Sequence, residues 1–284
     1  MELTLIGDKP LATAAMLSFE TSPEALVIDA REIGFVSPLD LAGVLAIAHW
    51  VSAAALPVTL CLPREPDAAS YFQRMDVLRR LPPRTRILGR IPPEKRTDLR
   101  HRLLEASPLT RANVDDLAEK VGDLVTAYYP DAVGPVVARA CNELLDNAVE
   151  HGASCEGAFI AAQTYTGATT KPPRLELAVC DNGVGILRHL RQNPAHQHLN
   201  TDVRALEEAL RNGVTGTRDT RGNGLGDLID DGRKHGTIRF HIRSGAGEIT
   251  VTAASQSRTV RPRTRPDQTQ GTWAWLSHEL PQQA

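Results

Sequence analysis

The sequence carries almost no excess charge of either sign. It has 32 lysines and arginines against 34 aspartates and glutamates, which gives a formal net charge of -2. Such a chain creates no overall field that would attract nucleic acid or an anionic membrane surface. Any binding of that kind would be local, and nucleic acid is not an expected partner.

Cysteine is scarce and scattered. The four cysteines contain no C-x-x-C pair, and a chain of this length does not need disulfides to hold its core. No basic stretch precedes an apolar run near the first residues, so a signal peptide is not expected. These features favour a cytoplasmic protein.

Long apolar runs are also missing. The longest, at 41–62, is interrupted by His49, Ser52 and Pro57. A membrane-spanning helix needs about 20 predominantly apolar residues, so no membrane partner is expected. Pro57 followed by Val-Thr-Leu instead favours a helix that passes into a buried strand.

What is present fits a folded α/β protein of about two domains, because 284 residues exceed the usual size of one domain. In the first part of the chain, residues 1–92, short apolar runs alternate with helical stretches, which predicts a small parallel or mixed sheet with helices against it. The expected strands are 26–28, 58–62 and 86–88, and the expected helices are 38–54 and 67–81.

A basic, proline-rich segment follows. Residues 79–102 hold nine lysines and arginines, two acids and four prolines. No aromatic side chains are interleaved for base stacking, which favours a solvated linker over a nucleic-acid patch. We place the linker at 93–102 and a second domain at 103–284.

Residues 135–151 predict a helix that Gly152 ends. Glu143, Asn147 and His151 are spaced by four, so they share one helical face. Such polar stripes usually face solvent, and the helix alone does not establish a site.

Two glycine-rich elements follow this helix. An alternating strand at 174–180 leads into Asp181, with Gly183 and Gly185 in D-x-G-x-G spacing. This spacing suits either a tight turn or a fixed carboxylate beside a flat ligand. A second loop opens another helix with alternate glycines, a pattern that directs backbone N–H groups at phosphate. These glycines are Gly222, Gly224 and Gly226.

The order of these elements, closed by Gly271-Thr272 and a terminal strand, resembles the GHKL ATPase superfamily of gyrase, mismatch-repair ATPases, sensor histidine kinases and anti-sigma-factor kinases. The resemblance covers about 136–280, and the segment 142–151 is most similar to the anti-sigma kinase branch. It implies a two-layer α/β sandwich for 103–284.

The resemblance also implies a role for individual residues, with ATP and Mg²⁺ as cofactors. Glu143 would be the general base, and Asn147 would help to coordinate Mg²⁺. Asp181 would accept the exocyclic amine of adenine, and Thr272 would support the base. The remaining implied nucleotide contacts are Gly183, Gly185, Arg218, Arg221, Gly222, Gly224 and Gly226.

The first part of the chain resembles a STAS domain, the module of anti-anti-sigma factors, at 25–30 and 33–43. In that family a serine that begins the following helix is phosphorylated. Here Pro38 and Leu39 occupy the matching positions, and Ser37 lies one place earlier. We therefore expect a STAS-like docking scaffold over 1–92 and leave phosphorylation of Ser37 open.

By the resemblance to GHKL ATPases, residues 187–221 form a lid, and Asn200 is the expected N-cap of a helix within it. His189, His196 and His198 in this lid suggest zinc ligands, but no further ligand has suitable spacing. We expect them to be exposed lid residues.

Three function classes follow. The first is a cytoplasmic ATP-binding regulator that resembles anti-sigma-factor serine kinases, and ATPase or protein-kinase activity is the favoured outcome. The second is a sensor histidine kinase, which is disfavoured because the segment around His101 lacks the H-E-x-x-x-P pattern. The third is a non-catalytic nucleotide-gated module. Expected partners are a STAS-like or sigma-factor-like regulatory protein and the chain's own first domain, and a homodimer stays open.

Overall fold

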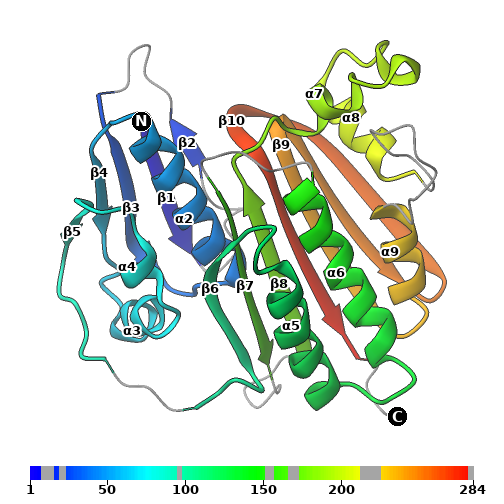
Figure 1. Cartoon of the computed structure of the whole chain (residues 1–284), viewed down its shortest axis with the longest axis horizontal. Coiled ribbons are helices and arrows are strands. Elements are labelled where there is room, and N and C mark those ends of the chain that lie inside the picture. Colours follow the sequence, from blue (N-terminus) through cyan, green and yellow to red (C-terminus); the bar gives the residue numbers. More distant parts are fainter. Residues whose placement is uncertain are drawn as a thin grey trace.

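The computed structural model has an α/β fold with two five-stranded sheets (Figure 1). It describes residues 1–7, 16–18, 24–94, 98–150, 157–165, 173–211 and 225–280. None of the helices in these ranges is long and apolar enough to cross a membrane.

The first sheet has the order β2-β1-β3-β4-β5, with β2 antiparallel to β1 and the other neighbours parallel. Its inward face is apolar because alternate residues point to it: Leu26 and Ile28 are buried, whereas Val27 is exposed. This arrangement confirms the predicted mixed sheet. The strands are β1 (Glu2–Gly7), β2 (Met16–Ser18), β3 (Leu26–Ile33), β4 (Val58–Cys61) and β5 (Arg86–Leu88).

The helix expected over 67–81 is two helices, α3 (Pro66–Arg74) and α4 (Val77–Arg80). The break lies at Asp76, whose φ of 60° is in the left-handed region. A left-handed residue cannot continue an α-helix, so the chain turns there.

The helix α2 (Pro38–Ala53) is buried almost all round. Apolar residues cover its whole circumference, which is typical of a helix enclosed on several sides. Ser37 caps its first turn: the Ser37 hydroxyl accepts from the Asp40 backbone N–H, and the Asp40 carboxylate accepts from the Ser37 backbone N–H at 2.7 Å. The capping box fixes where this helix begins.

The second sheet is antiparallel, with the order β6-β7-β8-β10-β9. Its last strands form a long hairpin that bends back on itself at Gly245, where φ is +57°. His241 Nδ1 lies 3.0 Å from Thr250 Oγ1 on the same strand, which requires this reversal. The strands are β6 (Leu103–Leu109), β7 (Ala158–Tyr165), β8 (Arg174–Asp181), β9 (Thr237–Ala254) and β10 (Ser257–Glu279).

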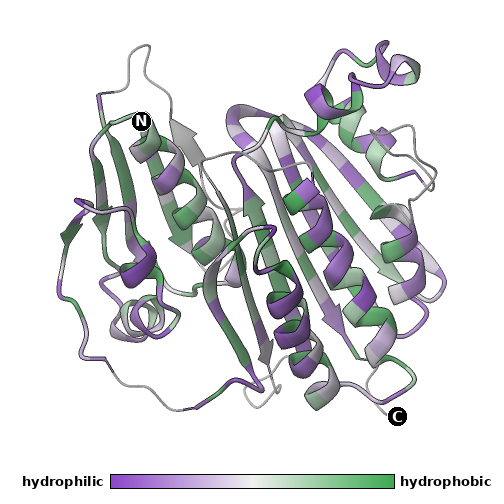
Figure 2. Ribbon diagram, in the orientation of Figure 1, coloured by the Kyte–Doolittle hydropathy of each residue, from purple (hydrophilic) through white to green (hydrophobic). Residues whose placement is uncertain are grey.

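The two faces of the second sheet contact different helices. Along β8, Leu177 and Val179 belong to the core beneath α5, α6 and α9, while Ala178 and Cys180 belong to the core around α2. Figure 1 shows α2 between the two sheets, and Figure 2 shows α5 and α6 with hydrophobic and hydrophilic sides. The bounds are α5 (Val114–Tyr128), α6 (Gly134–Glu150) and α9 (Leu225–Gly232).

One apolar core joins both sheets. Phe159, Trp273 and Trp275 of the second sheet belong to the same buried cluster as Leu45 of α2. The linker placed at 93–102 falls between β5 and β6, and the core continues across that point. The division into 1–92 and 103–284 stays a prediction.

The segment after β8 contains two short helices, α7 (Ile186–Leu190) and α8 (Asp202–Ala209). The side chain of Thr201, rather than that of Asn200, caps α8 by accepting from Arg204 N at 3.3 Å. The N-cap of this helix therefore lies one residue after the expected Asn200.

Candidate functional site

The carboxylate of Asp181 is held at the end of β8. Its Oδ1 accepts hydrogen bonds from Gly183 N at 2.7 Å and from Thr272 N at 3.2 Å. Burial raises the pKa of Asp181 to about 7, although these two N–H donors act to lower it. Both hydrogen bonds fall on Oδ1, so Oδ2 takes part in neither.

Thr272 and Asp181 lie on the same face of the second sheet. The register pairs Trp273 with Cys180, which places Thr272 opposite Asp181 on the neighbouring strand. Because successive side chains alternate, both residues lie on the side of α6 rather than on the side of α2. The sequence predicted these two residues at one site, and the structure brings them together.

Glycine is required beside this carboxylate. Gly271 has a φ of +69°, and a Cβ there would lie 2.1 Å from the Asp181 backbone oxygen. A Cβ at Gly185, whose φ is +76°, would lie 2.9 Å from Ser244 Oγ, and this hydroxyl donates to Gly271 O at 3.0 Å. These close approaches lock the D-x-G-x-G turn against β10.

The helix α6 carries Glu143 and Asn147 on its partly exposed side, one turn apart. Glu143 borders a narrow crevice between α6 and α9, together with Asp227 and Arg139. Burial and the nearby charge of Asp146 raise the pKa of Glu143, and Asp227 adds to the effect. A carboxylate with a raised pKa is suited to accept a proton near neutral pH.

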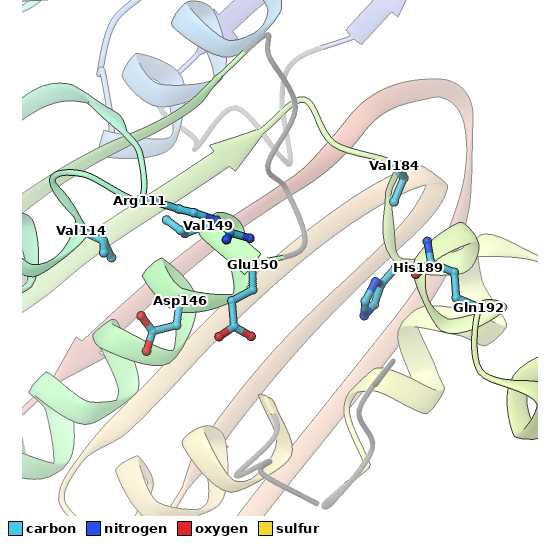
Figure 3. A pocket seen from close by; sticks show the side chains of 8 residues that line it. All are labelled: Arg111, Val114, Asp146, Val149, Glu150, Val184, His189 and Gln192. Atoms are coloured by element: carbon cyan, nitrogen blue, oxygen red, sulfur yellow. The ribbon is translucent and has the colours of Figure 1, made fainter. Parts of the chain in front are cut away.

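A cavity of about 650 Å³ lies between the end of α6 and α7 (Figure 3). Asp146 and Glu150 extend from α6, and His189 faces them across the cavity from α7. The volume falls within the ~300–1,000 Å³ typical of small-molecule sites. The lining residues are Arg111, Val114, Asp146, Val149, Glu150, Val184, His189 and Gln192.

Of the predicted site residues that the structure describes, none lines this cavity, and Gly185 lines a different one. Val184, between Gly183 and Gly185, belongs to its wall, whereas Glu143 belongs to the crevice beside α9. Gly226 is buried in the first turn of α9. Four of the predicted residues lie outside the described residues: Arg218, Arg221, Gly222 and Gly224.

Sequence reasoning missed the acids that line the cavity. Asp146 and Glu150 are one turn apart on α6, and burial followed by the charge of Glu150 raises the pKa of Asp146. The sequence held a signal for Asp146 and Glu150, because both belong to the helix that carries Glu143 and Asn147. Their exposed, acidic character gave no reason to single them out.

Asn182 was missed as well. Its side chain points to the other side of the sheet, where Nδ2 donates to Ala46 O of α2 at 2.8 Å. Gln270 donates in turn to Gly183 O at 2.7 Å. The D-x-G-x-G turn is therefore tied to α2 and to β10.

The acidic side chains near α6 are oxygen donors, the ligand type that Mg²⁺ prefers: Asp146 and Glu150 line the cavity, and Glu143 lines the crevice. Across the described ranges, no group of three or more histidine, cysteine or acidic side chains is placed to hold a metal. His198 instead lies with Nδ1 3.0 Å from Ala195 O.

Ser37 is fully buried in this structure, and its hydroxyl donates to Asp40 Oδ2 at 2.7 Å. A phosphoryl group there would meet the Asp40 carboxylate and has no access from solvent. The position discussed as an acceptor therefore acts as a helix cap.

Comparisons with known proteins do not assign the chain to a family. No protein-family model and no curated protein matches the chain. It is similar to the topoisomerase IV ATP-binding domain of Francisella tularensis in complex with a small-molecule inhibitor, at 14% identity and a TM-score of 0.22, over 38% of this chain and 27% of that one.

A second solved structure, the N-terminal domain of a DNA repair protein, is similar at 15% identity with a TM-score of 0.17, over 38% of this chain and 28% of that one. The chain spans less than a third of either neighbour. Likenesses at these TM-scores leave the family open.

Proposed function

We propose that the protein is a regulatory protein that binds ATP with Mg²⁺ on the α6 side of the second sheet. The observation that carries the proposal is the buried carboxylate of Asp181, fixed at a strand end by Gly183 and Thr272. A fixed acceptor in a buried site discriminates strongly between a ligand that donates a hydrogen bond there and one that does not.

Base selection follows from this geometry. Adenine carries an exocyclic amine that donates hydrogen bonds, whereas guanine carries a carbonyl oxygen at the same position. Asp181 Oδ2 lies outside the two backbone hydrogen bonds and serves as the acceptor for the adenine amine. A carboxylate facing the guanine oxygen is repulsive, so the site selects ATP over GTP.

The acidic side of α6 supports the phosphate end of the ligand. Asn147 supplies an amide oxygen for the metal, and Asp146 supplies a carboxylate close by on the same helix. Bound Mg²⁺ neutralises the phosphate charge, which these acids would otherwise repel. The raised pKa of Glu143 suits it to take a proton from water or from an acceptor hydroxyl.

A non-catalytic nucleotide-gated module is the second candidate. The observation in its favour is that Glu143 lies in the crevice between α6 and α9, beside Asp227, rather than on the large cavity. In such a module the nucleotide changes the conformation of the chain without turnover. A sensor histidine kinase is less supported, because His101 lies in a turn before β6 and not on a helix.

The first sheet supplies the regulatory part of the proposal. Its resemblance to STAS modules suggests docking of a regulatory protein of the STAS or sigma-factor type in the cytoplasm. The hydrogen bond from Asn182 to Ala46 gives that docking a direct connection to the nucleotide site. Buried Ser37 makes contact without phosphorylation the favoured relation.

Thermal unfolding with nucleotides tests the proposal. Mg-ATP is expected to raise the melting temperature by mass action, and Mg-GTP is not. Asp181→Asn should remove the ATP effect because an amide donor replaces one acceptor oxygen. Asp123→Asn, the same chemical change at an exposed position on α5, should keep it.

Two further variants separate binding from chemistry. Asn147→Ala should lose the Mg²⁺-dependent part of the ATP effect, and Glu143→Gln should retain binding. Loss of phosphate release or transfer in Glu143→Gln supports an enzyme; an unchanged background rate in wild type and variant supports the non-catalytic module. Equal stabilisation by GTP, or a full ATP effect in Asp181→Asn, overturns the proposal.

A further inference from the structure

A second cavity, of about 370 Å³, lies on the other side of α7. Its floor is the tight turn where Gly185, Ser244 and Gly271 meet. Its walls are formed by Arg188 of α7, by Arg191 directly after α7, and by the carboxylate of Asp202 at the start of α8. The nucleotide proposal uses none of these charged side chains.

The two arginines give this cavity a positive character. Both are exposed, and within the described part of the chain neither forms an ion pair. Asp202 is the single acid on the wall, and its Oδ2 already accepts from Ala246 N at 3.0 Å. The cavity wall therefore carries two guanidinium groups and one carboxylate, and one oxygen of that carboxylate already accepts a backbone hydrogen bond.

Guanidinium groups recognise carboxylate and phosphate through paired, charge-assisted hydrogen bonds. The remaining polar groups on the wall include the amide of Gln268 and the amide oxygen of Gln270, whose Nε2 already donates to Gly183 O. Such groups suit ligand hydroxyl groups. The volume lies near the lower end of the ~300–1,000 Å³ range for small-molecule sites. It fits a small metabolite and is too small for a folded partner.

The helix α7 separates this cavity from the larger one. Arg188 and Arg191 line the small cavity, whereas His189 and Gln192 line the large one, and Val184 belongs to both. The two cavities thus share one wall. A ligand that fixes Arg188 and Arg191 also fixes the backbone that carries His189 and Gln192.

We propose that the cavity beneath α7, formed by Arg188, Arg191 and Asp202 over the Gly185–Gly271 floor, binds a small hydroxylated organic anion through its carboxylate or phosphate group. The site uses charged groups that the nucleotide proposal does not use, while Gly185, an implied nucleotide contact, forms part of its floor.

Titration calorimetry of the full chain in a buffer without phosphate tests this site with three probes: citrate, glucose 6-phosphate and inorganic phosphate. At least one organic anion should bind more tightly than inorganic phosphate, because it adds hydroxyl contacts. A comparison of the affinities for citrate and for glucose 6-phosphate shows whether carboxylate or phosphate is the recognised group.

The double variant Arg188→Gln/Arg191→Gln should weaken binding of that probe at least tenfold. Arg188→Lys/Arg191→Lys should fall between this variant and wild type, since lysine keeps the charge and loses the planar fork. The matched control is Arg261→Gln/Arg263→Gln, which removes two exposed arginines of β10 away from the cavity. The control should bind like wild type.

Three results overturn the proposal: no probe binds, inorganic phosphate binds as tightly as both organic anions, or the cavity and control variants lose affinity equally. The arginines are exposed, so these variants should melt like wild type without ligand. Asp181→Asn should bind the anion like wild type, so failure of the nucleotide proposal and failure of this site are distinguishable.

Discussion

Helices α2 and α6 pack against opposite faces of the same sheet and have opposite characters. α2 is apolar around its circumference and is buried between the two sheets. α6 buries one side against the sheet and leaves Glu143, Asp146 and Asn147 on the other. One face of the sheet is therefore committed to packing, and the other face is available for a ligand.

Strand β8 takes part both in the packing against α2 and in the candidate ligand site on the α6 side. β8 directs Ala178 and Cys180 to α2 and directs Asp181 to the α6 side. At its end, Asn182 donates to α2 while Asp181 holds the turn beneath α6. Packing on the α2 side thereby fixes the position of a polar group on the other side.

Removal of residues 1–92 should have the largest effect. The deletion strips α2 from the second sheet and exposes Phe159, Trp273 and Trp275, which are buried in the intact chain. A contiguous exposed apolar patch of this kind promotes aggregation. We expect the fragment 93–284 to be insoluble or to lack a cooperative thermal transition, measured by circular dichroism and light scattering.

A milder version of the same change is Leu45→Ala in α2. The loss of a fully buried leucine should lower the free energy of unfolding by about 2–5 kcal/mol without preventing folding.

A soluble, monomeric and cooperatively folding 93–284 fragment would contradict the deletion prediction, because it would show that α2 is dispensable for the second sheet. The shared core would then be incidental to its stability.

Much of this arrangement was predictable from the sequence, and the missing part has a physical reason. The expected helices at 38–54 and 135–151 and the expected strand at 174–180 all lie within about two residues of α2, α6 and β8. The spacing of apolar residues within each segment is enough to locate these helices and this strand. The contacts of α2 with β7 and β8 join residues more than 100 positions apart, which no local spacing encodes.

One signal for that contact was present in the sequence. A helix with apolar residues on every side cannot face solvent, so 38–54 had to be enclosed by more than its own sheet. The chain reversal in β9 was missed for another reason. Gly245-Ala246-Gly247 lies inside a continuous extended run, and the bend is revealed by the contact between His241 and Thr250 of the same strand.

Gly271→Ala should have the next largest effect, and it acts on the α6 side of the second sheet, where the ligand is proposed to bind. The new Cβ would lie 2.1 Å from the Asp181 backbone oxygen, at a positive φ. Left-handed strain and overpacking each cost roughly 1–3 kcal/mol, so the free energy of unfolding should fall by several kcal/mol. Because Asp181 must move, the stabilisation by ATP should disappear as well.

Gly122→Ala in α5 is the matched control, since its Cβ would meet nothing within 4 Å. Alanine is the better helix former by roughly 0.8–1.0 kcal/mol, so this variant should be slightly more stable than wild type. Chemical denaturation measures both effects. A Gly271→Ala protein as stable as the control, with a normal ATP response, would show that the close approach to Asp181 is not required.

Per pH unit, the smallest effect is expected in the pH dependence of stability. Folding raises the pKa of Asp181 from 3.8 to about 7, because burial disfavours the charged form. The folded protein therefore binds more protons than the unfolded chain between these values. Its free energy of unfolding has the full contribution of protonated Asp181 below about pH 4 and loses it as the pH rises toward 7, by about 1.4 kcal/mol per pH unit at most.

Asp181→Asn cannot ionise, and its amide oxygen still accepts from Gly183 and Thr272. The variant should have nearly the same free energy of unfolding as wild type near pH 4 and a higher one at pH 8, measured by urea denaturation at several pH values. Bound ATP donates to the ionised carboxylate, so its affinity for wild type should rise between pH 6 and pH 8. Parallel stability profiles for wild type and Asp181→Asn would mean that Asp181 stays ionised in the folded protein, and its burial would then be offset by more than the two backbone donors.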